Sequence, residues 1–148
     1  MSGADFFDTN VFVYLFDDHD ARKQATAQSL VASALASDSG CISFHVVQET
    51  LHVLTRKFAK AASTQIAQDF LRDALAPLWR VQPSAALYVR TLDLQRRYRF
   101  SFYNSLIVAA ALEAGCARLL SEDLQDGQRI EGLTVENPFR AAAGSAKR

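Results

Sequence analysis

Residues 106–112 read LIVAAAL, a run that is apolar at every helical angle. A helix without a polar face is buried on all sides, so this segment is expected inside the protein rather than on its surface. Gly115 follows the run and is a typical residue for ending a helix. We therefore predict a buried helix over residues 101–115.

Short apolar stretches without polar alternation predict strands that are buried on both faces. One ends near Asp8, and the others cover residues 41–44, 79–81, 117–120 and 133–135. Helical patterns separate them, over residues 20–37, 47–58, 63–76 and 83–98, with Pro77 predicted to close the third. This alternation predicts an α/β fold, a three-layer α/β/α sandwich around a central parallel sheet of about four to five strands.

The length of 148 residues fits one domain, and we expect it to span residues 1–140, with a flexible tail over 141–148. An apolar share of 49% and a charged share of 22% are typical of a packed protein rather than a disordered one. No apolar run approaches the roughly 18 residues of a membrane span, and the N-terminus lacks the pattern of a signal peptide. These observations predict a cytoplasmic protein without a membrane partner.

Neither the net charge nor the two cysteines identify a binding partner or a reaction. Lys plus Arg equals Asp plus Glu at 16 each, so nucleic acid would have to bind a local patch rather than a global positive field. Cys41 and Cys116 stand in apolar surroundings without the spacing of a metal or redox motif. We expect both to be buried free thiols in a reducing compartment.

Four polar side chains are expected at one edge of the predicted sheet. Asp8 and Asp123 end strands, while Glu49 and Asn104 lie in the first turns of helices, and parallel sheets bind ligands at the carboxyl ends of their strands. Carboxylates about 4 Å apart repel by roughly 4 kcal/mol per pair at an effective dielectric of about 20. Oxygen ligands without cysteine select a hard cation, so a Mg²⁺ or Mn²⁺ site is predicted.

Each of these residues also has a purely structural interpretation. Asp8 is compatible with a turn or helix-capping role, and Glu49 with a solvated charge opposite an apolar helix stripe. Asn104 is compatible with capping its own helix beside Ser101. Asp123 is compatible with an acidic surface loop, so only the joint placement of the four favours a site.

Four segments together resemble the PIN domain, in particular the VapC-type toxins of bacterial toxin–antitoxin pairs. They read FDTNV from Phe7, QE at Gln48, FYNSLIVAAA from Phe102 and LSEDLQDG from Leu120. The resemblance implies a Mg²⁺- or Mn²⁺-dependent endoribonuclease toxin with acidic positions at Asp8, Glu49, 104 and Asp123. It also implies a homodimer and a cognate antitoxin protein that blocks the active site.

The chain departs from this family at position 104. The family has Asp there, whereas this sequence has Asn104. An amide keeps the shape and one oxygen but loses the negative charge. We therefore expect lower metal affinity and slower turnover than an aspartate would give.

Two other groups of residues are candidates for binding. Arg96, Arg97 and Arg99 precede the Asn104 helix and are candidates for contact with RNA phosphates, although basic residues also complement a helix C-terminus. Arg56, Lys57 and Lys60 are likewise candidates either for contact with RNA phosphates or for complementing the C-terminus of their helix. His45, Glu49 and His52 share a helical face, but the second such motif that a di-iron site needs is missing.

Three functions remain as hypotheses from the sequence. The leading one is a metal-dependent endoribonuclease that hydrolyses a phosphodiester. The second is a catalytically weak module on the same fold that binds RNA or antitoxin without cutting. The third, a phosphatase-like enzyme with Asp8 as phosphoryl acceptor, is disfavoured because Asn10 stands where a second Asp is expected.

Overall fold

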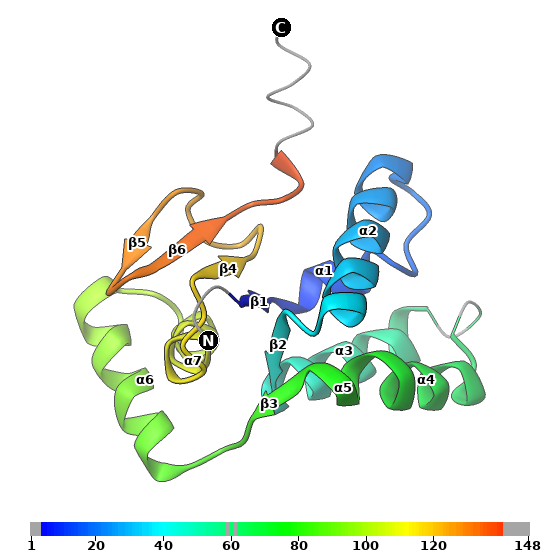
Figure 1. Cartoon of the computed structure of the whole chain (residues 1–148). Coiled ribbons are helices and arrows are strands. Elements are labelled where there is room, and N and C mark those ends of the chain that lie inside the picture. The colour runs from blue at the N-terminus through cyan, green and yellow to red at the C-terminus, as the bar shows by residue number, and fades with distance from the viewer. Residues whose placement is uncertain (1–3, 59, 61, 141–148) are drawn as a thin grey trace, which may run out of the picture.

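The computed structural model describes residues 4–58, 60 and 62–140 and has a six-stranded sheet at its centre (Figure 1). The strand order is β3-β2-β1-β4-β6-β5. All neighbours pair in parallel except β5 and β6, which form an antiparallel hairpin. The strands are β1 (Asp5–Phe7), β2 (Gly40–Ser43), β3 (Trp79–Val81), β4 (Arg118–Leu120), β5 (Arg129–Ile130) and β6 (Leu133–Glu136).

Helices cover both faces of this sheet, which confirms the predicted α/β class. In Figure 1, α6 and α7 lie together on one side of the sheet, and the helices of the first half of the chain lie on the other. The helices are α1 (Thr9–Val13), α2 (Ala21–Ser37), α3 (Phe44–Lys57), α4 (Thr64–Phe70), α5 (Ala76–Leu78), α6 (Ala85–Tyr98) and α7 (Phe102–Glu113). The short hairpin strand β5 is the one strand that the sequence did not predict.

The apolar run over residues 106–112 forms α7, which is buried as predicted. Every residue from 105 to 111 is buried, and the helix packs against α6, β2 and β4. Gly115 ends the segment with a φ of +73°, where a residue with a side chain would be strained. The Cys116 N–H donates to the Ala111 carbonyl, which closes the helix in the manner expected of a glycine at this position.

The predicted single helix over residues 63–76 is divided in the structure. Ser63 caps α4, since its hydroxyl accepts from the Ile66 N–H. A π-helical turn, η1 (Leu71–Leu75), then joins α4 to α5. Pro77 does not close the segment, because the helical backbone continues from η1 through α5 to Leu78.

The structure also bears on the cysteines and on membrane-spanning helices. Cys41 and Cys116 are buried and free, as predicted. Within the described residues, no helix combines the length and the apolar character needed to cross a bilayer. The tail predicted for residues 141–148 lies outside the described residues.

Candidate functional site

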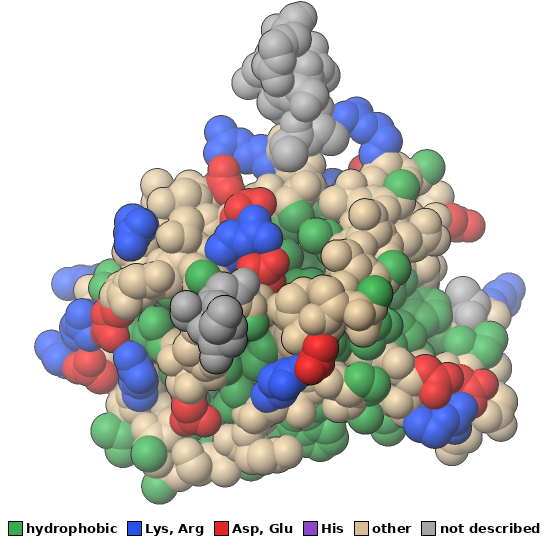
Figure 2. All heavy atoms as spheres, in the orientation of Figure 1, with side chains coloured by type: hydrophobic (Ala, Val, Ile, Leu, Met, Phe, Trp, Pro, Cys, Tyr) green, Lys and Arg blue, Asp and Glu red, His purple; other side chains and the backbone are tan. Residues whose placement is uncertain are grey.

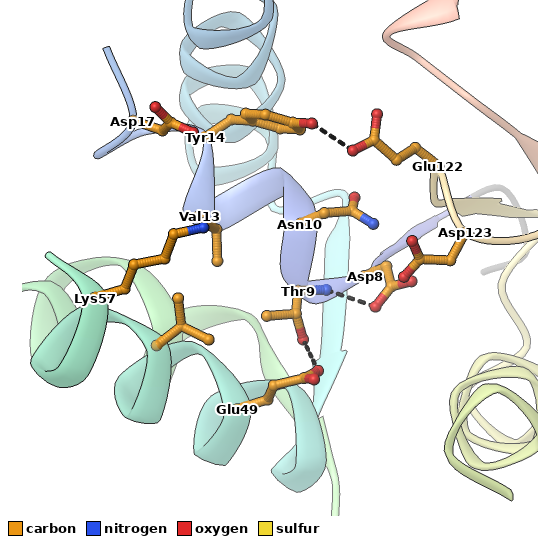
Figure 3. A pocket seen from close by; sticks show the side chains of 11 residues that line it. Asp8, Thr9, Asn10, Val13, Tyr14, Asp17, Glu49, Lys57, Glu122 and Asp123 are labelled. Atoms are coloured by element: carbon orange, nitrogen blue, oxygen red, sulfur yellow. Dashed lines mark hydrogen bonds between the residues drawn. The ribbon is translucent and has the colours of Figure 1, made fainter. Parts of the chain in front are cut away.

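Three of the four predicted site residues line one cavity of about 350 Å³ at the carboxyl edge of the sheet (Figure 3). Asp8 follows β1, Asp123 lies in the loop after β4, and Glu49 lies on α3, the helix that follows β2. These strands are parallel neighbours with β1 between the other two. Their carboxyl ends therefore bring residues from three distant parts of the sequence to one place.

Asp8 is the most buried carboxylate of this group, with only 4% of its surface exposed. It is the N-cap of α1, so the capping role that the sequence allowed is real. One oxygen accepts from the Thr9 N–H at 2.7 Å, and the other accepts from the Ser121 hydroxyl at 2.6 Å. Burial raises the pKa of Asp8 to about 6, and the nearby charges of Asp123 and Glu49 add to the rise against the effect of the two hydrogen bonds.

Glu49 is exposed on α3, but its side chain is not freely solvated. The Thr9 hydroxyl donates a hydrogen bond of 2.6 Å to its Oε1 atom, and the carboxylate faces the cavity (Figure 3). Thr9 thus contacts two acidic side chains, since its N–H holds Asp8 while its hydroxyl holds Glu49. The interpretation of Glu49 as an isolated surface charge does not describe this arrangement.

Asp123 faces the same cavity from the loop after β4. Partial burial raises its pKa, and the negative charges of Glu122 and Glu49 raise it further. The amide of Asn10 lies close enough to lower the pKa of Asp123. The two groups are nevertheless not oriented for a hydrogen bond. The Asp123 N–H donates to the Ser121 hydroxyl at 3.1 Å, so this hydroxyl connects the Asp123 loop with Asp8.

Asn104 is not among the residues that line the cavity. It lies half-buried in the first turn of α7, where its N–H donates to the Ser101 side chain at 3.1 Å. The C-terminus of α7 leads directly into β4, so the first turn of α7 lies toward the edge where β4 ends. The structure therefore places Asn104 at the expected edge but outside the cavity wall.

The arginines predicted to contact RNA are mostly engaged elsewhere. Arg96 and Arg97 near the end of α6 form ion pairs with Asp93, and Arg97 also pairs with Glu131. Arg99 caps α6 with a φ of +64°. None of the three lines the cavity.

The side chains of His45 and His52 do not lie together with the Glu49 carboxylate. His45 is stacked on Tyr103, with ring centroids 4.9 Å apart and planes 9° from parallel. Burial lowers the pKa of His45. His52 instead faces a hollow that it shares with Arg56 and Lys57. This arrangement offers no support for a di-iron type of site.

Within the described residues, the group whose ligand atoms all lie within 4.8 Å of one another is Asp17, Asp18 and His19. It is a local turn in which the side chains of Asp18 and His19 are about nine-tenths exposed. Water screens such charges, so their proximity needs no ion. The three cavity carboxylates are spaced more widely but include the buried Asp8, for which a missing counter-charge costs much more.

The donor set of the cavity fits a hard divalent cation. Within the described residues, no Lys or Arg forms an ion pair with Asp8, Glu49 or Asp123, and both atoms of the Asn10 amide are buried without a hydrogen-bond partner. Asn10 lines the same cavity as the carboxylates. Carboxylate and amide oxygens are the ligands that Mg²⁺ and Mn²⁺ prefer.

Sequence reasoning missed the two hydroxyls that organise the cavity. Thr9 and Ser121 stand inside segments whose acidic residues drew attention, but neither was assigned a role. The available indication was a hydroxyl close to each aspartate, since Thr9 directly follows Asp8 and Ser121 lies two residues before Asp123. Their partners lie 40 and 113 positions away, so the contacts themselves were not visible in the sequence.

Comparisons with known proteins agree with this geometry. The PIN domain matches residues 6–129 of the chain, whereas the comparison with curated proteins gives no match. The solved structure of Mycobacterium tuberculosis VapC20, a sarcin-ricin loop cleaving toxin, shares 25% sequence identity at a TM-score of 0.59 and covers 81% of this chain and 92% of that one.

Two further solved structures show the same fold. A toxin–antitoxin complex from Klebsiella pneumoniae has a TM-score of 0.64 at 21% identity, and FitAcB from Neisseria gonorrhoeae has 0.62 at 18%. Each covers 91% of this chain and 98% of its own. The match over most of the length, together with acidic side chains at the carboxyl edge of a parallel sheet, leads to one conclusion: the chain belongs to the PIN domain family.

Proposed function

We propose that this chain is a divalent-metal-dependent endoribonuclease toxin of a toxin–antitoxin pair. The observation that carries the proposal is the cavity lined by the buried Asp8 together with Glu49 and Asp123, none of which forms an ion pair with a Lys or Arg among the described residues. Similarity to a sarcin-ricin loop cleaving toxin supports RNA as the substrate class. The proposed ion is Mg²⁺ or Mn²⁺.

Asp8, Glu49 and Asp123 would hold the ion, with position 104 as a weaker fourth member. Such an ion activates water and stabilises the charge that develops on a phosphodiester. Thr9 and Ser121 would keep the carboxylates in place, because their hydroxyls fix one oxygen each of Glu49 and Asp8. The burial that raises the pKa of Asp8 also keeps bulk water from screening the carboxylate.

The first test restores the acidic side chain at position 104. We expect Asn104→Asp to increase single-turnover cleavage of a structured RNA by roughly ten- to a hundredfold with Mg²⁺ or Mn²⁺, the range by which neighbouring groups typically change a metal site. The matched control is Gln82→Glu, which adds the same charge at an exposed position outside the cavity. Equal rates for the original chain and Asn104→Asp would show that position 104 does not belong to the site.

A second candidate function is favoured by Asn104 itself. The amide removes one negative charge from the family pattern, and a weakened site suits a module that retains RNA or antitoxin without cutting. RNA binding with no cleavage at high Mn²⁺, in both the original chain and Asn104→Asp, would favour this module over the nuclease.

We further propose an antitoxin protein as partner and a homodimer as the assembly. The fold is shared with a chain from a toxin–antitoxin complex. Light scattering of the purified chain, alone and with a co-expressed small neighbouring gene product, measures both. A monomer at every concentration would contradict the homodimer.

A further inference from the structure

Two hollows next to the acidic cavity are lined by basic side chains. One is lined by His52, Val53, Arg56 and Lys57. The other is lined by residues that include Arg56, Lys57 and Lys60, together with one carboxylate, Asp18. Val53 lines both the acidic cavity and the first hollow, and Lys57 lines all three. We call His52, Arg56, Lys57 and Lys60 the basic strip.

Figure 3 shows where the basic strip meets the cavity. Lys57 extends from α3 on the side of the cavity away from Asp8 and Asp123. Glu49 lies in the second turn of α3, which begins at Phe44, and the basic strip follows it toward and beyond the C-terminus of the helix. A chain that enters the cavity from this side would pass over the strip first.

The positive charges of the strip are not neutralised by ion pairs. Within residues 4–58, 60 and 62–140, the ion pairs engage Arg90, Arg96 and Arg97 of α6, but not Arg56, Lys57 or Lys60. On the face drawn in Figure 2, Lys and Arg side chains mostly lie beside Asp and Glu side chains. An arginine that is already paired must give up its carboxylate before it binds a phosphate.

The helix dipole explains only part of this arrangement. Arg56 and Lys57 lie in the last turn of α3, where positive charge is stabilising. Lys60 lies beyond the helix and His52 lies before its last turn, so the dipole accounts for neither.

We propose that the basic strip binds the backbone phosphates of the RNA beside the bond that is cut, a proposal that rests on the function above. A cavity of carboxylates repels a polyanion, so a protein without net positive charge needs local cations next to it to hold RNA there. Arg56 offers a bidentate donor for phosphate, and the lysines offer point charges. The arginines of α6 then serve α6 and the β5–β6 turn rather than RNA.

The experiment removes two charges from the strip and measures binding without divalent ions. The test variant is Arg56→Gln/Lys57→Gln, and the matched control is Arg96→Gln/Arg97→Gln, which removes the same charge from α6. Binding of a labelled single-stranded RNA is followed by fluorescence anisotropy in EDTA over a series of salt concentrations. Each lost phosphate contact reduces the slope of log K against log salt by about 0.7.

We expect the strip variant to lose about 1.4 in slope and to bind roughly tenfold more weakly at low salt, with the α6 variant within about twofold of the original. The charge-preserving exchange Arg56→Lys/Lys57→Arg should restore most of the slope, which separates loss of charge from loss of folding. An unchanged slope in the strip variant, or equal losses in both variants, overturns the proposal.

Failure of the strip and failure of the nuclease give different results. If the strip variant loses RNA binding while no form of the chain cuts RNA, the strip binds RNA and the nuclease proposal falls. If the original chain cuts RNA and the strip variant binds and cuts equally well, the nuclease proposal stands and the strip proposal falls.

Discussion

Asp8 illustrates how one side chain serves both folding and a site. As the N-cap of α1 it satisfies the Thr9 N–H, a contribution that typically stabilises a helix by about 1 kcal/mol. Its burial at the end of β1 has the opposite effect, because an ionised carboxylate loses its water there. The pKa of Asp8 is raised because the effect of burial exceeds that of the hydrogen bonds, so the ionised side chain destabilises the folded protein. Such unfavourable charges are common at functional sites.

The pKa of Asp8 predicts how stability depends on pH in the metal-free protein. The pKa of about 6 in the folded state exceeds the ordinary aspartate pKa of 3.8, so the folded state binds the proton more tightly. The resulting stabilisation is complete below pH 3.8 and is lost as the pH rises through 6, a difference of about 3 kcal/mol. Asp8→Asn should therefore stabilise the protein by up to about 3 kcal/mol at pH 7 and by little at pH 4.

Urea unfolding in EDTA at the two pH values measures this difference. An asparagine keeps an acceptor for the Thr9 N–H and can donate to Ser121, so the local hydrogen bonds survive the change. Equal effects of Asp8→Asn at pH 4 and pH 7 would contradict the assigned cause, since a packing defect would not depend on pH.

The elements with a clear apolar pattern are the ones that the sequence could predict. The buried helix α7 and the parallel strands follow from local apolar patterns, so these elements and the edge that gathers Asp8, Glu49 and Asp123 were predictable, whereas the order of the strands in the sheet was not predicted. The division of residues 63–76 by a π-helical turn was not, because the period of a helix does not reveal where one residue is inserted. Strand β5 has only two residues, too few for any pattern.

A hydrogen-bonded group fixes the loop of Asp123 to two helices. The hydroxyl of Tyr14, the C-cap of α1, donates to Glu122. Lys23 on α2 donates to the Tyr14 hydroxyl at 3.0 Å and to Glu122 at 3.1 Å. These bonds raise the pKa of Lys23, first through Tyr14 and then through Glu122. Because Glu122 directly precedes Asp123, this group helps to position one wall of the cavity.

Tyr14→Phe removes the hydroxyl at the centre of this group. The ring still packs against Phe139, with centroids 4.7 Å apart, so the expected loss is that of hydrogen bonding, about 1 kcal/mol. At roughly 2–4 °C per kcal/mol for a chain of this size, Tm should fall by about 2–4 °C. Tyr98→Phe is the matched control, because the Tyr98 ring stacks on Phe100 and its hydroxyl makes no hydrogen bond within the described residues. A similar fall in both variants would mean that the Tyr14 group does not stabilise the loop.

The cavity joins three parts of the chain that are far apart in sequence, and this has a consequence for the whole molecule. An ion held by Asp8, Glu49 and Asp123 would connect β1, α3 and the loop after β4. The unfolded chain cannot assemble these ligands, so the ion binds only the folded state. Binding free energy then becomes folding free energy.

Divalent ions should therefore raise Tm, even without any RNA. At an ion concentration of 100 times Kd the stabilisation is about 2.7 kcal/mol, which corresponds to a rise of roughly 5–10 °C for about 150 residues. Differential scanning calorimetry with Mn²⁺ against EDTA measures the rise. It should be larger in Asn104→Asp, unchanged in Gln82→Glu and absent in Asp8→Asn.

The same set of proteins separates the cavity from the exposed turn at Asp17, Asp18 and His19. If that turn held the ion, Asp18→Asn would abolish the rise in Tm and Asp8→Asn would keep it. Because Asp8 loses an unfavourable charge on substitution, its variant starts from a higher Tm at pH 7 than the original chain. A variant that is more stable alone and insensitive to Mn²⁺ can be explained only by a buried carboxylate whose charge the ion relieves.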